Sequence, residues 1–389
     1  MVQRWAGRGS LLVISFTLLA ACAGFGERFA APVVAPQSEP AAIGGGQVRV
    51  ALILPLSGAG NAGLAAQSMK NAAELALLEF NTPNVQLLVK DDGGTPAGAQ
   101  AAVQQALSEG AEIILGPLFA QSVQAAGQLT RARGVPIIAF STDSSVAARG
   151  VYLLSFLPES DVDRVVSYSV SQGKRSFAGL VPEGAYGSVV EAAFKETVAR
   201  RGGRIIALER YPADRLRMQE PVRIVAQAAS RVDAIFIPDG ADFAPQVVQS
   251  LGASGAGPRR SQLLGSGLWD DARIYADTSL HGGWFAAPDA SGFNSFAQRY
   301  RAKFGQEPVR TATLAYDATA LIAALVKTQG PQRFSDEVLT NASGFAGIDG
   351  IFRFRPDGTN ERGLAVLRVT PSGGQVVSPA PRSFGGSGT

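Results

Sequence analysis

The chain has 389 residues, of which 46% are hydrophobic and 17% are charged. Residues 1–21 carry two arginines and no acidic residue, and the remainder holds 33 basic against 32 acidic side chains. This near-neutral balance, without a cluster of Lys or Arg, argues against nucleic-acid binding. No stretch after residue 21 approaches the roughly 18 uninterrupted apolar residues of a membrane-spanning helix.

The N-terminus predicts an export signal. Arg4 and Arg8 precede an apolar stretch over residues 11–21, which is too short to cross a bilayer. The sequence LAAC at residues 19–22 resembles a bacterial lipobox, in which the cysteine becomes the lipidated first residue. Cys22 is the only cysteine and cannot form an intramolecular disulfide. We therefore predict a lipoprotein signal peptide over residues 1–21 and lipidation of Cys22. The alternative is an ordinary signal peptide.

Two segments without periodicity flank the rest of the chain. Residues 22–46 are rich in proline, alanine and glycine and predict a flexible tether. Residues 371–389 predict a disordered tail for the same reason. Lipoproteins kept at the inner membrane of Gram-negative bacteria commonly carry Asp after the cysteine, whereas this chain has Ala23. If the host is Gram-negative, Ala23 therefore favours an outer-membrane anchor facing the periplasm.

Apolar strands alternate with helices from Gln47 onward. Helices are predicted at 61–81, 96–110 and 120–134, and the strands around them at 48–55, 85–92, 111–116 and 135–141. Continuously apolar strands separated by helices are typical of a parallel sheet that is covered on both faces.

The alternation restarts near residue 161. Helices are predicted at 161–173, 186–203, 218–231 and 242–254, with strands at 175–182, 203–211, 232–238, 261–267 and 282–288. Two amphipathic helices then follow without a strand between them, at 293–305 and 311–329. An antiparallel pair is predicted over 347–369, around an Asp-Gly turn. The chain is therefore expected to return to its first α/β unit instead of adding a third.

The ordered set of motifs resembles the type I periplasmic solute-binding proteins, in the leucine/isoleucine/valine-binding branch. The resemblance runs over roughly residues 47–370 and includes VRVALILPLSGAG, VKDDGGTPAGAQAAVQQAL, IILGPLFAQSVQAAGQL, VPEGAYG and LAYDATALIAAL. It implies an α/β fold of two Rossmann-like lobes with parallel sheets, joined by three crossovers near Leu157, Pro288 and Gly344. Lobe one would then comprise residues 47–157 plus 289–343, and lobe two residues 158–288 plus 344–370. The ligand would lie in the cleft between the lobes.

Candidate ligand contacts in lobe one follow the C-terminal ends of the predicted strands. Helix N-termini present free N–H groups there, and hydroxyl or amide side chains add further bonds to a carboxylate or amide oxygen. Ser57 follows the first strand, and the resemblance implies contacts after the third and fourth. These candidates are Ser57, Gln121, Ser122, Ser141, Thr142 and Ser144. The alternative is that the serines are helix caps and turn formers.

Lobe two offers fewer candidates. The resemblance implies that Tyr186 closes over the ligand, the alternative being a half-buried tyrosine at a helix start. It also implies an acid for a ligand ammonium, but Gly267 and Leu268 stand at that place. Asp239, at a strand end, is the candidate substitute, or else a helix cap. This departure argues against branched-chain amino acids themselves as ligands.

Catalysis is not indicated. His281 is the only histidine, and the neighbouring acids Asp91–Asp92 and Asp270–Asp271 point apart on an extended chain. No phosphate-binding loop or zinc spacing is present in the sequence. We therefore expect a protein that is not an enzyme and uses no cofactor.

Two binding roles stay open. The first is a lipid-anchored periplasmic binding protein that delivers a small amino-acid-like or amide ligand to an ABC permease. The second is an outer-membrane regulator of peptidoglycan synthesis. Residues 263–369 look like the C-terminal domain of penicillin-binding-protein activators, which contact a peptidoglycan synthase.

Overall fold

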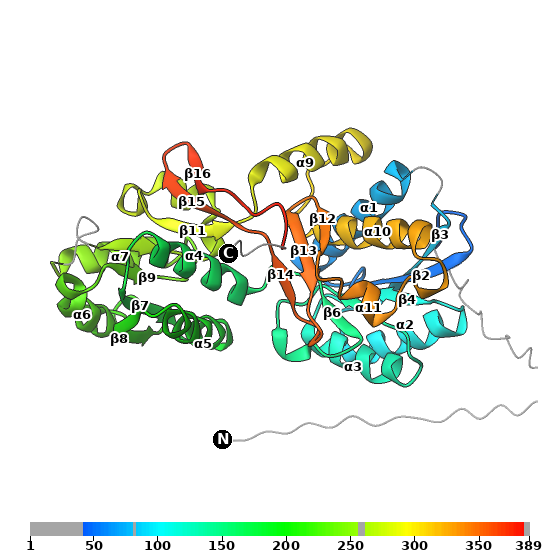
Figure 1. Ribbon diagram of the computed structural model, residues 1–389, viewed down its shortest axis with the longest axis horizontal. Coiled ribbons are helices and arrows are strands. Elements are labelled where there is room, and N and C mark those ends of the chain that lie inside the picture. The colour runs from blue at the N-terminus through cyan, green and yellow to red at the C-terminus, as the bar shows by residue number, and fades with distance from the viewer. Residues whose placement is uncertain (1–41, 81–82, 256–260, 385–389) are drawn as a thin grey trace, which may run out of the picture. The chain divides into compact units, whose positions relative to one another are not determined.

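The computed structural model describes residues 42–80, 83–255 and 261–384 of the chain. The predicted signal peptide, Cys22 and Ala23 lie outside the described residues. Figure 1 shows two α/β groups of elements, one coloured blue to cyan with orange and the other green to yellow with red. None of the helices in the described ranges has the length and apolar content needed to cross a membrane.

Sheet A is the parallel sheet of lobe one, with one short antiparallel strand at its edge. Its strand order is β1-β3-β2-β4-β5-β6. The strands are β1 (Ala42–Ile43), β2 (Val48–Leu54), β3 (Val85–Asp91), β4 (Ile113–Leu115), β5 (Ile137–Ala139) and β6 (Val151–Leu153). The helices between them are α1 (Asn61–Glu79), α2 (Pro96–Ser108) and α3 (Ala120–Arg131).

Both faces of sheet A are covered, which explains why its strands read as continuous apolar runs. Along β2, Leu52 and Leu54 enter a core with α1 and α10 (Ala312–Thr328). Ala51 and Ile53 point to the opposite core, against α2 and α3. Alternate side chains of one strand therefore fill two separate cores.

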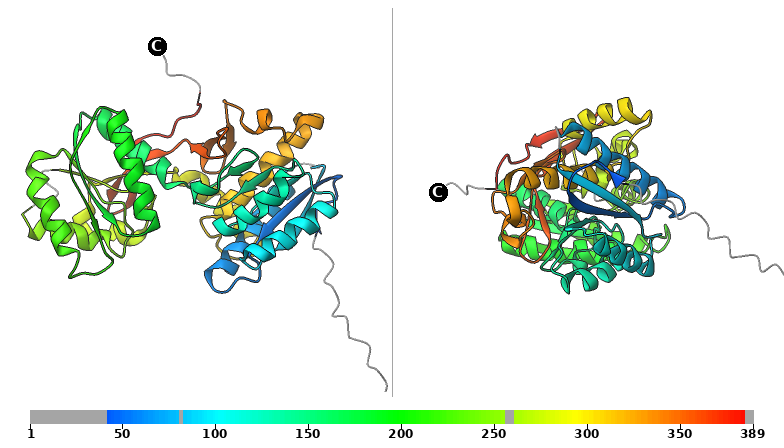
Figure 2. Two further views of the ribbon diagram at one scale, coloured as in Figure 1. Left: turned by 90° about the horizontal axis from the view of Figure 1, so that it is seen from below. Right: turned by 90° about the vertical axis from the view of Figure 1, so that its right-hand side faces the viewer.

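Sheet B is the corresponding sheet of lobe two, with strand order β16-β15-β11-β10-β9-β7-β8. Its parallel strands are β7 (Ser176–Pro182), β8 (Arg204–Tyr211), β9 (Ala234–Phe236), β10 (Gln262–Leu264) and β11 (Trp284–Ala287). Its antiparallel strands are β15 (Ala365–Thr370) and β16 (Gly373–Ser378). Helices cover both faces, as Figure 2 shows. They are α4 (Pro158–Ser171) and α5 (Ala185–Arg200) on one face, and α6 (Gln219–Ala228) and α7 (Ala244–Ala253) on the other. The predicted fold class, two lobes built on parallel sheets, is confirmed.

The third crossover lies later than predicted. Strands β12 (Phe345–Gly347), β13 (Gly350–Phe354) and β14 (Asn360–Arg362) form a separate antiparallel sheet C. Phe352 and Phe354 are buried in the same core as β2 and α10. The assignment of residues 344–362 to lobe two is therefore wrong, because their apolar face packs on lobe one. The chain joins sheet B only at Ala365.

The predicted tail and tether are both too long. Residues 373–378 form β16, which pairs with the edge strand β15 through its backbone. Phe384 then stacks on the guanidinium of Arg353, 4.6 Å from the ring centroid. At the other end, β1 pairs with β3 inside the predicted tether. Backbone pairing with a strand already in place needs no apolar pattern, so neither strand could be recognised from its residues.

The remaining helices are short, apart from α9 (Ala290–Phe304), which packs on α1. They are α8 (Ala272–Ala276), α11 (Asp336–Leu339) and 3₁₀ turns that include η1 (Ser144–Val146) and η3 (Gly267–Trp269). The two predicted helices after lobe two correspond to α9 and α10.

Candidate functional site

The loop after β2 presents Ser57 at the C-terminal edge of sheet A. Ser57 is exposed, and its backbone N–H lies 3.2 Å from both carboxylate oxygens of Asp91. Asp91 also accepts the N–H of Gly93 at 2.9 Å. The acidic loop after β3 therefore holds the backbone of the β2 loop, while the Ser57 side chain stays at the surface.

The first turn of α3 places Gln121 and Ser122 differently. Gln121 is exposed, whereas Ser122 is fully buried. Burial raises the pKa of Asp92, and the Gly94 N–H and the Ser122 hydroxyl partly offset that rise. No side chain caps the start of α3. Its first N–H groups are therefore available to an anion, and Gln121 is the accessible side chain beside them.

The loop after β5 holds the other three hydroxyl candidates. Ser141 is buried, and its Oγ accepts the N–H of Asp143 at 3.1 Å. Thr142 is exposed. Ser144 donates to Oε1 of Glu159, in the first turn of α4, at 2.6 Å. Ser141 thus acts as a turn former here, and Thr142 is the exposed member of these three candidates.

A polar cluster lies at the C-terminal edge of sheet B. Tyr186, in the first turn of α5, shares a 2.8 Å hydrogen bond with the Ser266 hydroxyl. Asp239, after β9, accepts from the Tyr211 hydroxyl at 2.5 Å and from the Gly240 N–H at 2.7 Å. Burial raises the pKa of Tyr186, and the carboxylates of Asp161 and Asp239 raise it further. Tyr186 and Asp239 therefore both lie at this edge of sheet B, bonded to Ser266 and to Tyr211 respectively.

Asp161 is the member of this cluster that sequence reasoning missed. It lies in the first turn of α4, and an acidic residue at that position is common because it interacts favourably with the helix dipole. The sequence pattern therefore did not mark it as a site residue. Its Oδ2 accepts the Gly267 N–H at 2.9 Å, and burial raises its pKa to about 7. A Cβ at residue 267 would lie 2.8 Å from that oxygen. Gly267, which stands where the resemblance implies an acid, thus makes room for an acid from another element.

The two edges approach each other at the start of α4. Ser144 of lobe one bonds Glu159, and Glu159 in turn raises the pKa of Asp161 by charge repulsion. The first turn of α4 therefore carries both Glu159, which bonds the β5 loop, and Asp161, which bonds Gly267.

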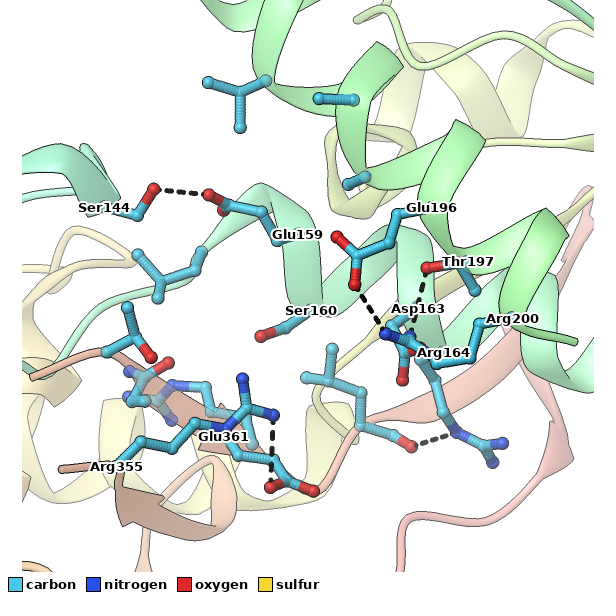
Figure 3. Close-up of a pocket in the computed structure, with 18 of the residues that line it drawn as sticks. Ser144, Glu159, Ser160, Asp163, Arg164, Glu196, Thr197, Arg200, Arg355 and Glu361 are labelled. Atoms are coloured by element: carbon cyan, nitrogen blue, oxygen red, sulfur yellow. Dashed lines mark hydrogen bonds and ion pairs between the residues drawn. The ribbon is translucent and has the colours of Figure 1, made fainter. Parts of the chain in front are cut away.

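A cavity of about 1020 Å³ lies beside this junction. It is lined by α4, α5, the β13–β14 turn and residues 381–384, and Ser144 is the predicted contact among its lining residues. Figure 3 shows its charged side chains, including Arg200 near Glu196 and Arg355 near Glu361. Gln121 instead lines a smaller cavity of about 300 Å³ between α3 and residues 143–148. Neither cavity gathers the predicted contacts as a set.

The chain matches one protein family and is similar in fold to several solved structures. The family model described as "Periplasmic binding protein" matches residues 47–375. A putative branched-chain amino acid ABC transporter protein from Rhodospirillum rubrum has a TM-score of 0.76 and 21% identity, covering 85% of this chain and 99% of that one. A branched-chain amino acid periplasmic ligand-binding protein from Burkholderia xenovorans LB400 has a TM-score of 0.69 and 18% identity, covering 87% and 97%.

Two further proteins are similar to this chain, one over most of its length and one over about a third of it. A solute-binding protein from Rhodopseudomonas palustris BisB5, solved with 3,4-dihydroxybenzoic acid, has a TM-score of 0.62 and 19% identity, covering 86% of this chain and 96% of that one. An uncharacterized protein of Rickettsia prowazekii is 20% identical over 142 residues, or 36% of this chain. That match spans only 38% of the relative's length.

Proposed function

Since this chain belongs to the periplasmic binding protein family, we propose that it binds a small amino-acid-like or amide solute between its lobes. Uptake through an ABC permease is the role that we infer, with no chemical step at the site. The observation that carries the proposal is the contrast between the two edges. Lobe one offers neutral hydrogen-bonding groups, and lobe two offers buried acids beside a tyrosine.

The lobe-one edge suits the carboxylate or amide oxygen of a solute. Gln121 is exposed at the uncapped start of α3, and Thr142 and Ser57 are exposed on the loops after β5 and β2. Free N–H groups at a helix start attract anionic oxygen, and neutral side chains can complete its hydrogen bonds. Ser122 and Ser141 point inward and support the loops, so we assign them no direct contact.

The lobe-two edge suits a cationic or hydrogen-bond-donating group. Tyr186 bonds Ser266, and the next residue, Gly267, bonds Asp161. The carboxylates of Asp161 and Asp239 both raise the pKa of Tyr186. An ammonium that replaces water here would gain a charge-assisted hydrogen bond. The solved relatives described as branched-chain amino acid transport proteins are compatible with such a zwitterionic solute.

Calorimetry on the mature protein tests this proposal with amino acids, amides and aromatic acids as candidate solutes. We expect Asp239→Asn to weaken binding of an ammonium-bearing solute at least about tenfold, because one charge-assisted bond contributes on the order of 1.5–3 kcal/mol. Asp242→Asn is the matched control, since Asp242 is 75% exposed and pairs with Arg273. No binding across the whole set, or equal effects of both variants, would count against the proposal.

We also propose that Cys22 carries a lipid that anchors the protein on the periplasmic side of a membrane. Support comes from the lipobox-like sequence and from membership of a periplasmic family. Cys22→Ala should abolish palmitate labelling and release the protein from the membrane fraction. In a Gram-negative host, Ala23→Asp should keep the lipidated protein at the inner membrane. Unchanged labelling in Cys22→Ala would refute the anchor.

The alternative role is regulation of a peptidoglycan synthase from the outer membrane. Two observations favour keeping it: Ser122 and Ser141 are buried, which leaves few accessible hydroxyls for a solute, and Ala23 suits an outer-membrane anchor. Crosslinking in cells followed by purification separates the two roles. Recovery of an ABC permease supports uptake, whereas recovery of a peptidoglycan synthase supports regulation.

A further inference from the structure

The chain segment after β16 leads from lobe two back toward lobe one. Strand β16 ends at Ser378 in sheet B, and the residues that follow run toward sheet C, which packs on lobe one (Figure 1). We call residues 379–384 the strap. The strap passes residues 363–364, which form the third crossover between β14 and β15.

Lobe two holds the start of the strap through Arg164 on α4. The Arg164 guanidinium donates to the Ser378 hydroxyl at 2.7 Å and to the Pro379 carbonyl at 3.3 Å. Its Nε donates to the carbonyl of Leu364, on the third crossover, at 2.8 Å. Ala380 packs against the apolar core that lies between sheet B and the helices α6 and α7. The first two residues of the strap are therefore fixed to lobe two.

Sheet C holds the other end of the strap through the ring of Phe384. This ring lies over the Arg353 guanidinium, 4.6 Å from the ring centroid. Two bonds to Glu361, of 3.0 and 2.7 Å, and one to the carbonyl of Ala342, of 3.0 Å, hold Arg353 on sheet C. A Cβ at Gly344 would lie 2.8 Å from the Phe384 ring, so the ring also rests on the backbone there. The strap is therefore anchored to both lobes.

The middle of the strap packs on the third crossover. A Cβ at Gly363 would lie 3.1 Å from the carbonyl oxygen of Pro381 and 3.2 Å from its Cγ. Pro379 and Pro381 each fix one φ angle, which limits the conformations of the strap. Residues 379–384 can span at most about 20 Å. A strap of this length, held at both ends, limits how far lobe two can move from sheet C.

A cavity beside the strap leaves room for such movement. The cavity of about 1020 Å³ lies between α5 and the β13–β14 turn, and Pro381 and Phe384 are among its lining residues. Figure 3 shows Glu196 on α5 and Arg355 on the turn facing this space from its two sides. Across the cavity, lobe two and sheet C are not packed against each other, and the strap bridges them at its edge.

We propose that the strap restrains the movement of the two lobes. While Phe384 stays on Arg353, lobe two is held near sheet C, and release of Phe384 lets the lobes rotate further about the crossovers. Domains joined by a few residues rotate about those residues as rigid bodies. One cation–π contact is a weak anchor, so its release requires no unfolding of either lobe. The restraint acts in the protein without solute and does not depend on the proposed function.

Distance measurements by pulsed electron paramagnetic resonance on the mature protein without solute test this restraint. In a Cys22→Ala background, spin labels at Leu78→Cys on α1 and Ala199→Cys on α5 report the separation of the lobes, since both residues are exposed. Ending the chain after Ser378 removes the strap and should broaden the distance distribution. Ending it after Phe384 keeps the strap and should leave the distribution unchanged.

Point variants isolate the Phe384 anchor. Phe384→Ala should enlarge the fraction of molecules outside the wild-type distance range about 2- to 30-fold, the change expected for the loss of one cation–π contact. Phe384→Trp keeps a ring on Arg353 and should behave as wild type. Phe334→Ala is the matched control, because the Phe334 ring also contacts an arginine, Arg333 at 5.7 Å, but within lobe one.

An unchanged distance distribution in the chain that ends after Ser378 would overturn the proposal. Broadening in that chain without any in Phe384→Ala would also overturn it, since the restraint depends on Phe384 staying on Arg353. Equal broadening in Phe334→Ala would do the same, because it would reflect general destabilisation. Failure of solute binding would count against the proposed function and would leave these distances unaffected.

Discussion

At the scale of single residues, burial decides which polar side chains are available to a solute. Ser57, Gln121 and Thr142 face solvent, whereas Ser122 and Ser141 point into lobe one. Serines at strand ends can serve as ligand contacts or as turn formers, and only the surrounding packing separates these uses.

Asp317 allows a prediction about pH dependence. Burial raises its pKa to about 7 in the folded protein, against about 4 in an unfolded chain. The folded state therefore binds more protons than the unfolded state between these values, and this group lowers the free energy of unfolding as the pH rises from 4 to 7. Asp317→Asn should remove that effect.

Urea denaturation of wild type and Asp317→Asn from pH 4 to pH 8 checks this. As the pH rises, the unfolding free energy of Asp317→Asn should increase relative to that of wild type, by at most about 4 kcal/mol. Asp233→Asn is the control, and its stability relative to wild type should fall with rising pH instead of increasing. Backbone N–H groups lower the Asp233 pKa and stabilise its ionised form. Parallel curves for wild type and Asp317→Asn would contradict the prediction.

At the scale of elements, sheet C depends on an ion pair that fixes the β12–β13 turn to the start of α10. Asp349 is fully buried, and the guanidinium of Arg310 is its cationic partner. Arg310 also stacks on Phe156 and Phe293, at 4.7 and 4.8 Å. A buried carboxylate that loses its cation keeps the cost of desolvation without the compensating attraction.

Arg310→Met should therefore destabilise the protein by about 3 kcal/mol or more, measured as the free energy of unfolding in urea. Arg223→Met is the control. Its pair with Glu220 leaves both side chains more than half exposed, and such pairs contribute about 0–1 kcal/mol. Equal small effects in both variants would show that the Arg310 pair does not hold sheet C.

The C-terminal segment is a second element with a testable role. Arg164 donates to the Ser378 hydroxyl at 2.7 Å and to the Pro379 carbonyl at 3.3 Å, and Phe384 packs on Arg353. Ending the chain after Ser378 should lower the free energy of unfolding by about 1–2 kcal/mol, for one hydrogen bond and one cation–π contact. Ending it after Phe384 should change stability little. Identical melting temperatures for both truncations would refute this role.

At the scale of the whole molecule, binding between two lobes joined by crossovers predicts closure on a solute. Leu64 in lobe one and Leu216 in lobe two are 67% and 86% exposed and suit spin labels. In a Cys22→Ala background, labels on Leu64→Cys and Leu216→Cys should move closer when solute is added. Labels on Leu64→Cys and Leu78→Cys, both on α1, should keep their distance. An interlobe distance that ignores a bound solute would argue against closure.

The sequence by itself determined the two α/β units, the order of their helices and most parallel strands. Doubly covered strands such as β2 must be apolar on both faces, and this pattern is visible in the sequence alone. The same interpretation named Tyr186, at a helix start, and Asp239, at a strand end, as candidate ligand contacts, and both lie at the C-terminal edge of sheet B.

Only the tertiary structure decided which lobe sheet C packs on, where the third crossover lies and which acid lies near Tyr186. Strands β1 and β16 join their sheets by backbone bonds that leave no apolar pattern. Asp161 reaches the Tyr186 cluster because α4 packs beside Gly267, a contact across 106 residues of chain. Contacts between distant elements depend on packing geometry, and local sequence patterns do not encode it.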